Sequence, residues 1–300
     1  MPVGLSLGTP RGVRYAVPAD LRHDETMNTE LSLLDVARIL ATETGELIIS
    51  GRASATVSAT KSSAADIVTQ MDIAAETHLR ERLAVLRPLD GILGEEGDDV
   101  HSASGITWVL DPIDGTVNYL YGLPHFAVSV AAVSGTPTSH EWTAEAGAVY
   151  DGSGTVWSAA RGQGATRNGE PLVRTTGPSL AGTLLATGFQ YLADRRAVQG
   201  EIVRQLLPQV RDIRRLGAAS VDLCLVAAGV IDAYYEHGLN AWDFAAGALI
   251  ASEAGLKVAG IDGGPANEHL TIVAAEGTWD ALRDALDSAG ARQPWGAPRV

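Results

Sequence analysis

The chain has 300 residues, of which 36 are acidic and 22 basic, giving a net charge of −14 at pH 7. Hydrophobic residues make up 46% and charged residues 19%, as in ordinary globular proteins, which excludes bulk disorder. The acidic balance argues against direct nucleic-acid binding, because such a surface repels phosphate backbones. A small anionic substrate stays compatible with it, since a bound metal inverts the local field.

Cysteine content and apolar patterning exclude further classes. Cys224 is the single cysteine, so neither a disulfide framework nor a cysteine-based zinc site is possible, and we expect it to be buried. The longest apolar runs, residues 127–133 and 223–231, are shorter than the roughly 20 residues of a membrane helix, so no membrane partner is expected. Residues 1–28 contain no apolar signal segment and are predicted to form a flexible tail. We therefore expect a cytoplasmic protein.

The first predicted element is an amphipathic helix over residues 29–50, where apolar residues recur at helical spacing. Residues 53–65 are rich in Ser, Thr and Ala and are predicted to be a mobile loop. Thr69 and Asp72 have the spacing of a capping box that starts a second helix, which Pro88 ends. The apolar face of this helix is expected to comprise Ile73, Leu79, Leu83 and Leu86.

Strands dominate the rest of the first half, and helices alternate with strands after about residue 178. Strands are predicted over residues 91–94, 107–110, 126–133, 147–150, 156–160, 165–173, 184–187, 212–215, 230–236 and 271–275. Asn168-Gly169 bends one of them in a type I′ hairpin turn. Helices are predicted over residues 195–207, 219–228 and 242–254. The sequence thus predicts an α/β fold with an α+β first half and an α/β second half, as one domain over residues 29–295 with subdomains 29–177 and 178–295.

Two carboxylates three residues apart, Asp111 and Asp114, follow the apolar strand 107–110. Pro112 removes a backbone donor between them, and Gly115 allows a ligand to approach the backbone closely. At about 4 Å, two such charges repel by about 4 kcal/mol at an effective dielectric constant near 20. Either one carboxylate stays protonated or a cation lies between them, and oxygen ligands favour Mg²⁺, Mn²⁺ or Ca²⁺. The alternative is that both aspartates cap the following helix.

More acidic residues lie at the ends of predicted elements, where the active sites of α/β sheets are found. Glu95 and Glu96 follow the strand 91–94, and Asp243 opens the helix after the strand 230–236. Solvated glutamates and a favourable helix-dipole interaction are the simpler interpretations of these acids. The sequence contains neither a phosphate-binding Gly-x-x-x-x-Gly-Lys loop nor a His-Glu-x-x-His zinc motif.

The acidic segments carry a family resemblance. Residues 108–119, WVLDPIDGTVNY, resemble the first motif of the inositol monophosphatase family, and residues 241–248, AWDFAAGA, resemble its second. Three shorter matches are residues 68–72 (VTQMD), 94–96 (GEE) and 233–238 (AYYEHG). The resemblance runs in order from about Leu31 to Ala285 and is closest to bacterial inositol-1-phosphatases.

The resemblance implies a layered αβαβα fold and a Mg²⁺-dependent, lithium-sensitive phosphomonoesterase that forms a homodimer. Two or three Mg²⁺ ions would be held by Glu95, Asp111, the carbonyl of Ile113, Asp114 and Asp243. The attacking water would be oriented and deprotonated by Asp72 and Thr116. The phosphate would meet the backbone N–H groups of Gly115 and Thr116 at a helix N-terminus. The polyol would meet Asp114, Ala219, Glu236 and Asp243.

The expected substrate is a small phosphorylated polyol, myo-inositol 1-phosphate, because Glu236 can accept hydrogen bonds from polyol hydroxyls. Histidinol phosphate, fructose 1,6-bisphosphate and a 3′-phosphoadenosine nucleotide are alternatives on the same fold. A regulatory protein that binds a macromolecular partner is a further alternative. Ala218 stands where relatives often carry Ser or Thr, and Lys61 matches a family lysine expected near the third metal ion.

Overall fold

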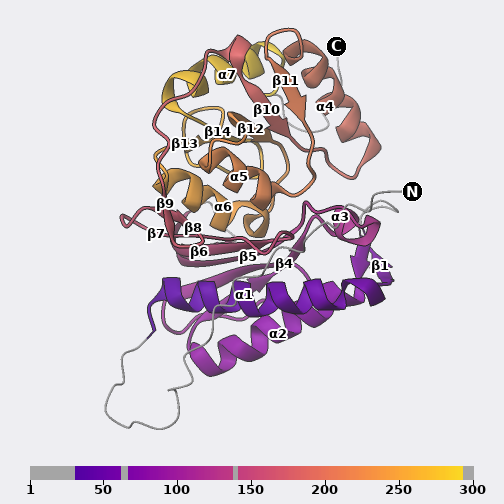
Figure 1. Cartoon of the computed structure of the whole chain (residues 1–300), viewed down its shortest axis with the longest axis vertical. Helices are drawn as coiled ribbons and strands as arrows, with labels where there is room; N and C mark the ends of the chain where they lie inside the picture. Colours follow the sequence, from indigo (N-terminus) through magenta and orange to yellow (C-terminus); the bar gives the residue numbers. More distant parts are fainter. Residues whose placement is uncertain (1–30, 62–66, 138–140, 293–300) are drawn as a thin grey trace, which may run out of the picture. The chain divides into compact units, whose positions relative to one another are not determined.

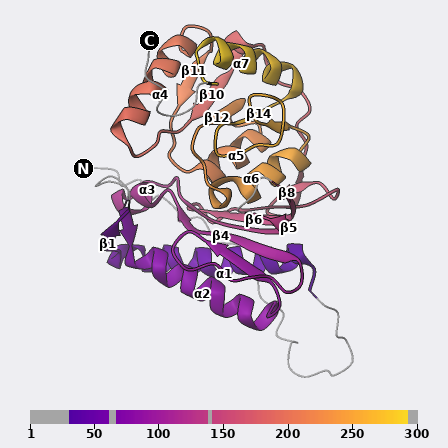
Figure 2. The ribbon, with the colours of Figure 1, turned by 180° about the vertical axis from the view of Figure 1, so that it is seen from behind.

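The fold is described for residues 31–61, 67–137 and 141–292 of a computed structural model. The predicted tail over residues 1–28 lies outside the described residues, as do residues 62–65 of the predicted loop. In the described part, helices and sheets form five layers in the order αβαβα, which Figures 1 and 2 show from opposite sides. This arrangement confirms the predicted mixed α/β fold.

Two helices cover one face of the first sheet: α1 (Leu33–Gly51) and α2 (Gln70–Leu86). At the start of α2, Thr69 and Asp72 each accept a hydrogen bond from the other's backbone N–H, which confirms the predicted capping box. The prediction for Ile73 is wrong, because its side chain is 48% exposed. The buried face of α2 is set by Ala75, Leu79 and Leu83, four residues apart, and Ile73 points away from it.

The first sheet has seven strands in the described residues, ordered β3 to β9 as in the chain. Only β3 and β4 pair in parallel; the later pairs are antiparallel. The strands are β3 (Gly91–Gly94), β4 (Ile106–Asp114), β5 (Ala127–Thr136), β6 (Glu141–Asp151), β7 (Val156–Ala160), β8 (Ala165–Arg167) and β9 (Glu170–Leu172). The predicted hairpin turn between β8 and β9 is confirmed, since Asn168 and Gly169 both have positive φ angles.

Strand β4 continues beyond its predicted end and contains an irregularity at the two aspartates. Asp111 pairs with Ser129 and Asp114 with Ala127, so β4 has one residue more than β5 in this interval. Pro112 lies in the interval and has no N–H to give to the ladder. Such a bulge turns the strand locally and re-aims its side chains. Both carboxylates consequently lie at one end of the sheet.

The second sheet has five strands in the described residues, in the order β11-β10-β12-β14-β13. They are β10 (Leu184–Thr187), β11 (Asp212–Arg214), β12 (Ala233–Glu236), β13 (Lys257–Ala259) and β14 (Thr271–Ala274). Between the two sheets lie α5 (Ala219–Ala227) and α6 (Ala241–Glu253) (Figure 1). On the far side of the second sheet lie α4 (Ala193–Leu206) and α7 (Glu276–Ser288). One hydrophobic core between the sheets joins residues from both halves of the chain, including buried Cys224 as predicted.

Some elements differ from the prediction. Residues 57–60 form β1, which pairs with β2 (Ile67–Thr69), where the sequence predicts a loop. The strand predicted from Val230 begins only at Ala233, because the chain turns after α5 and leaves Val230 57% exposed. Helix α7 is not predicted at all, although it buries Trp279, Leu282 and Leu286 on one side.

Candidate active site

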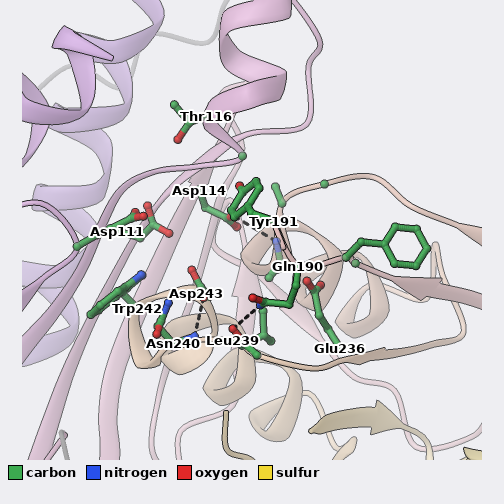
Figure 3. A pocket seen from close by; sticks show the side chains of 18 of the residues that line it. Asp111, Asp114, Thr116, Gln190, Tyr191, Glu236, Leu239, Asn240, Trp242 and Asp243 are labelled. Carbon is green, nitrogen blue, oxygen red and sulfur yellow. Dashed lines mark hydrogen bonds between the residues drawn. The ribbon is translucent and has the colours of Figure 1, made fainter. Parts of the chain in front are cut away.

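A pocket of about 460 Å³ opens where β4 and β12 end and where α3 (Thr116–Tyr121), α5 and α6 begin. Figure 3 shows its carboxylates converging from these elements. Of the predicted site residues, those that line the pocket are Glu95, Asp111, Ile113, Asp114, Gly115, Thr116, Ala219, Glu236 and Asp243. Asp72 is the exception: it lies behind Thr116, to which it is hydrogen-bonded. The structure therefore brings together in one pocket residues as far apart in the sequence as Glu95 and Asp243.

The carboxylates at the base of the pocket raise each other's pKa. Burial, reinforced by neighbouring acids, raises the pKa of Asp111 and of Asp243 well above the ordinary aspartate value. Burial also raises the pKa of Glu95 to about 7, against the opposing effect of Lys61. The charge of Glu95 and hydrogen bonding with it add to the raised pKa of Asp111, so protonation of one of these acids is favoured when no cation is present. This is one of the two solutions that the sequence predicts for clustered acids.

The donor set fits a hard divalent cation in kind. It consists of buried and partly buried carboxylates and a backbone carbonyl, the oxygen ligands that Mg²⁺ prefers, and its acids outnumber the one lysine beside them. Within the described residues, no three His, Cys, Asp or Glu side chains are already gathered at ligating distance around one point. Glu95 is instead engaged by Lys61, whose Nζ lies 2.9 Å from Glu95 Oε1 and 2.7 Å from Glu96 Oε1. Binding of a cation would therefore compete with protonation of these acids and with Lys61.

Asp72 and Thr116 form the pair that the sequence predicts. Thr116 Oγ1 lies 3.1 Å from Asp72 Oδ1 and 2.9 Å from the carbonyl oxygen of Ile113. The other carboxylate oxygen, Asp72 Oδ2, accepts hydrogen bonds from the N–H and hydroxyl of Thr69. Burial raises the pKa of Asp72. Asp72 Oδ1 can thus take up a proton through the threonine hydroxyl.

Donors from the starts of two helices hold two further carboxylates. Asn240 N–H donates to Asp243 Oδ2 at 2.7 Å at the start of α6. At the start of α5, Asp114 accepts hydrogen bonds from Ala219 and Ser220. The second oxygen of Asp243 is left toward the pocket, whereas both oxygens of Asp114 accept hydrogen bonds, Oδ1 only a long one of 3.3 Å from the Ala219 N–H.

Glycine is required at Gly115, where α3 begins. Its φ angle is +82°, and an added Cβ would lie 2.9 Å from the carbonyl oxygen of His125. The backbone turn at this point starts α3, and free N–H groups at a helix start favour an anion. Asn118 Nδ2 fixes the turn by donating to the carbonyls of His125 and Leu216.

Glu236 lies on the opposite side of the pocket from Asp111 (Figure 3). The hydroxyl of buried Tyr234 donates to Glu236 Oε2 at 2.6 Å. Burial raises the pKa of Glu236 to about 7, and the tyrosine hydrogen bond opposes that rise. At neutral pH this carboxyl is therefore balanced between its two protonation states.

Several pocket residues do not follow from the sequence patterns. Arg215, Gln190 and Tyr191 line the side near Glu236, and Tyr234 and Ser220 support site carboxylates from behind. One sequence signal was available for the contact between α5 and Asp114. The residue before α5 is Ala218, a poor N-cap, so the first N–H groups of the helix need an acceptor from elsewhere in the chain. Arg215 gives no local signal, because a pair of neighbouring arginines such as Arg214-Arg215 is common on protein surfaces.

Solved structures of related proteins have a similar fold. A solved structure of Mycobacterium tuberculosis SuhB has a TM-score of 0.74 and 43% identity, over 89% of this chain and all of that chain. The inositol-1-monophosphatase SuhB of Mycobacterium tuberculosis is 48% identical over 245 residues, 78% of this chain and 82% of the relative. The Nus factor SuhB of Escherichia coli is 39% identical over 236 residues, 77% of this chain and 86% of the relative.

The profile of the inositol monophosphatase family matches residues 30–290. The protein therefore belongs to the inositol monophosphatase family, as its motifs predict, and is a phosphatase by that membership. No helix in the described part of the chain is long and apolar enough to cross a membrane.

Proposed function

We propose that the protein is a Mg²⁺-dependent phosphomonoesterase that hydrolyses myo-inositol 1-phosphate to inositol and phosphate. The observation that carries this proposal is the cluster of four carboxylates, Glu95, Asp111, Asp114 and Asp243, in one pocket with the start of α3, of which Asp111 and Asp114 are buried and the other two partly buried. Such a cluster is costly to keep without a cation, and phosphoryl transfer needs positive charge beside a positioned water.

Two or three Mg²⁺ ions would be held by Glu95, Asp111, the Ile113 carbonyl, Asp114 and Asp243. When bound, they would supply positive charge that offsets the phosphate and lowers the pKa of a water molecule. Thr116 Oγ1 would accept a hydrogen bond from that water while donating its own proton to Asp72 Oδ1. Asp72 would thereby orient the water and take up its proton. The N–H groups of Gly115 and Thr116 would bind the phosphate.

Polyol recognition would fall to the other side of the pocket. Asp114 Oδ1, which accepts only one long hydrogen bond, the Ala219 backbone, Glu236 and Asp243 would bind hydroxyl groups. The name of the Mycobacterium tuberculosis relative, an inositol-1-monophosphatase, supports this substrate. By the same family resemblance we propose a cytoplasmic, lithium-sensitive homodimer without direct nucleic-acid binding, in which residues 29–177 and 178–295 are subdomains.

A phosphate-release assay tests the proposal. The panel is inositol 1-phosphate, histidinol phosphate, fructose 1,6-bisphosphate and 3′-phosphoadenosine 5′-phosphate, each with and without Mg²⁺. We expect Mg²⁺-dependent turnover of inositol 1-phosphate, lost in Asp111→Asn and kept in Asp99→Asn, a change at an exposed aspartate. Selective turnover of another member of the panel would keep the phosphatase assignment and change the proposed substrate. Folded protein that turns over none of the four compounds would refute the proposal.

A second candidate function is regulation through a macromolecular partner, because the Escherichia coli relative is named a Nus factor. Partner binding of this kind would not require the carboxylate pocket. A partner-binding role would therefore survive Asp111→Asn in cells, whereas a role that depends on phosphatase activity would be lost.

A further inference from the structure

Helix α5 begins without a local cap. Its N-cap residue is Ala218, which has no side-chain acceptor, so the first N–H groups of the helix need a partner from elsewhere. Asp114 at the end of β4 provides it. The N–H of Ala219 lies 3.3 Å from Asp114 Oδ1, and the N–H of Ser220 lies 2.7 Å from Asp114 Oδ2.

A side chain reinforces this contact. The hydroxyl of Ser220, which has no exposed surface, donates to Asp114 Oδ2 at 2.5 Å. Oδ2 therefore accepts two short hydrogen bonds from a single residue, while Oδ1 accepts one long one. The two carboxylate oxygens are thereby made unequal, and Oδ1 keeps most of its acceptor capacity.

We propose that Ser220 is a positioning residue for the phosphatase reaction: its hydroxyl fixes the rotation of the Asp114 carboxylate so that Oδ1 is presented to the cation and the polyol. This inference rests on the proposed function, since it concerns the use of Asp114 in that site. Ser220 itself does not line the pocket, so it would touch neither the cation nor the polyol.

The size of the expected effect follows from similar support around metal ligands. Loss of a hydrogen-bonding partner behind a ligand typically weakens metal affinity about 10–100-fold. In Ser220→Ala, Asp114 keeps the two N–H donors, so the fold and the helix cap remain. The carboxylate loses the donor that restricts its rotation, so ligand binding should suffer more than folding.

The experiment compares wild type, Ser220→Ala and Ser220→Cys, in which a thiol replaces the hydroxyl as a weaker donor. Ser158→Ala is the matched control, because Ser158 is also buried and hydrogen-bonded but lies on β7, outside the pocket. Each protein is unfolded thermally at a series of Mg²⁺ concentrations, and kcat and KM for inositol 1-phosphate are measured at saturating Mg²⁺.

We expect Ser220→Ala to unfold, without Mg²⁺, within a few degrees of Ser158→Ala. The Mg²⁺ concentration that gives half of the thermal shift should rise about 10-fold or more in Ser220→Ala, less in Ser220→Cys, and stay unchanged in Ser158→Ala. KM should rise more than kcat falls. A half-maximal Mg²⁺ concentration within about twofold of wild type would overturn the inference. If wild type itself shows neither a Mg²⁺-dependent shift nor phosphate release, the proposed function fails, and this inference fails with it.

Discussion

Glu236 should make the protein less stable as the pH rises, and its replacement by glutamine should remove that dependence. The pKa of Glu236 is raised from 4.5 to about 7 in the folded protein, mainly by burial. Between these two values the folded state binds more protons than the unfolded state. The free energy of unfolding must therefore fall as the pH rises through this range.

The pKa difference sets the magnitude. A shift from 4.5 to about 7 corresponds to about 3 kcal/mol of destabilisation above pH 7, an upper value because Glu236 retains some contact with solvent. Glutamine has the same shape, carries no charge and can still accept the Tyr234 hydrogen bond. Glu236→Gln should therefore be more stable than wild type by roughly 2–3 kcal/mol at pH 8 and equal to it near pH 4.

Urea unfolding at pH 4 to 8 in the presence of a chelator measures this directly. Glu95 also has a raised pKa and gives wild type a slope of the same sign, so the difference between wild type and Glu236→Gln isolates Glu236. Glu170→Gln, a change at an exposed glutamate, is the control and should leave the profile unchanged. A Glu236→Gln protein that is no more stable than wild type at pH 8 would refute the reasoning. Its KM for inositol 1-phosphate should rise, because a hydroxyl acceptor is lost.

Three other predictions concern the remaining site residues. Without Mg²⁺, Asp111→Asn should unfold at a higher temperature than wild type, because the repulsion between residue 111 and the neighbouring carboxylates falls. Asp111→Asn should show no Mg²⁺-dependent thermal shift, and a retained shift would contradict the metal assignment. The unfolding free energy of Asp72→Asn should stay within about 1 kcal/mol of wild type, because an acceptor for the Thr69 N–H remains. Its kcat should fall about 10²–10⁴-fold. An unchanged kcat would exclude Asp72 as the base. Lys61→Gln should lower the half-maximal Mg²⁺ concentration in thermal-shift titrations, because a competing cation leaves Glu95; a higher value would show that Lys61 assists binding instead.

Local patterns predicted the parts of the molecule that depend on neighbours in the chain. The Thr69–Asp72 capping box, the Asn168-Gly169 turn and the aspartates after the strand at residue 107 each need only a few adjacent residues. Strand β1 was missed because its pairing with β2, not its polar composition, makes it a strand. Helix α7 was missed although the spacing of its apolar residues carried the signal.

The support of the site could not be predicted in the same way. The contact of Ser220 with Asp114 and the orientation of Tyr234 toward Glu236 depend on how α5 and β12 lie against β4. No periodicity encodes such a relation between distant segments. The acids could be identified because each lies where a strand or helix ends or begins. The hydroxyl groups of Ser220 and Tyr234 cannot be told from those of other core residues by sequence alone.

The contact between Asp114 and α5 has a consequence for the order of events during synthesis. Asp114 and Ala219 are 105 residues apart in the chain. At about 5–20 residues per second, a ribosome needs roughly 5–20 s to make the second partner after the first. Throughout that time the carboxylates of β4 have no helix start to bind and stay hydrated. A nascent chain that ends before α5 therefore has no complete site, and phosphatase activity would report that both halves of the protein have folded.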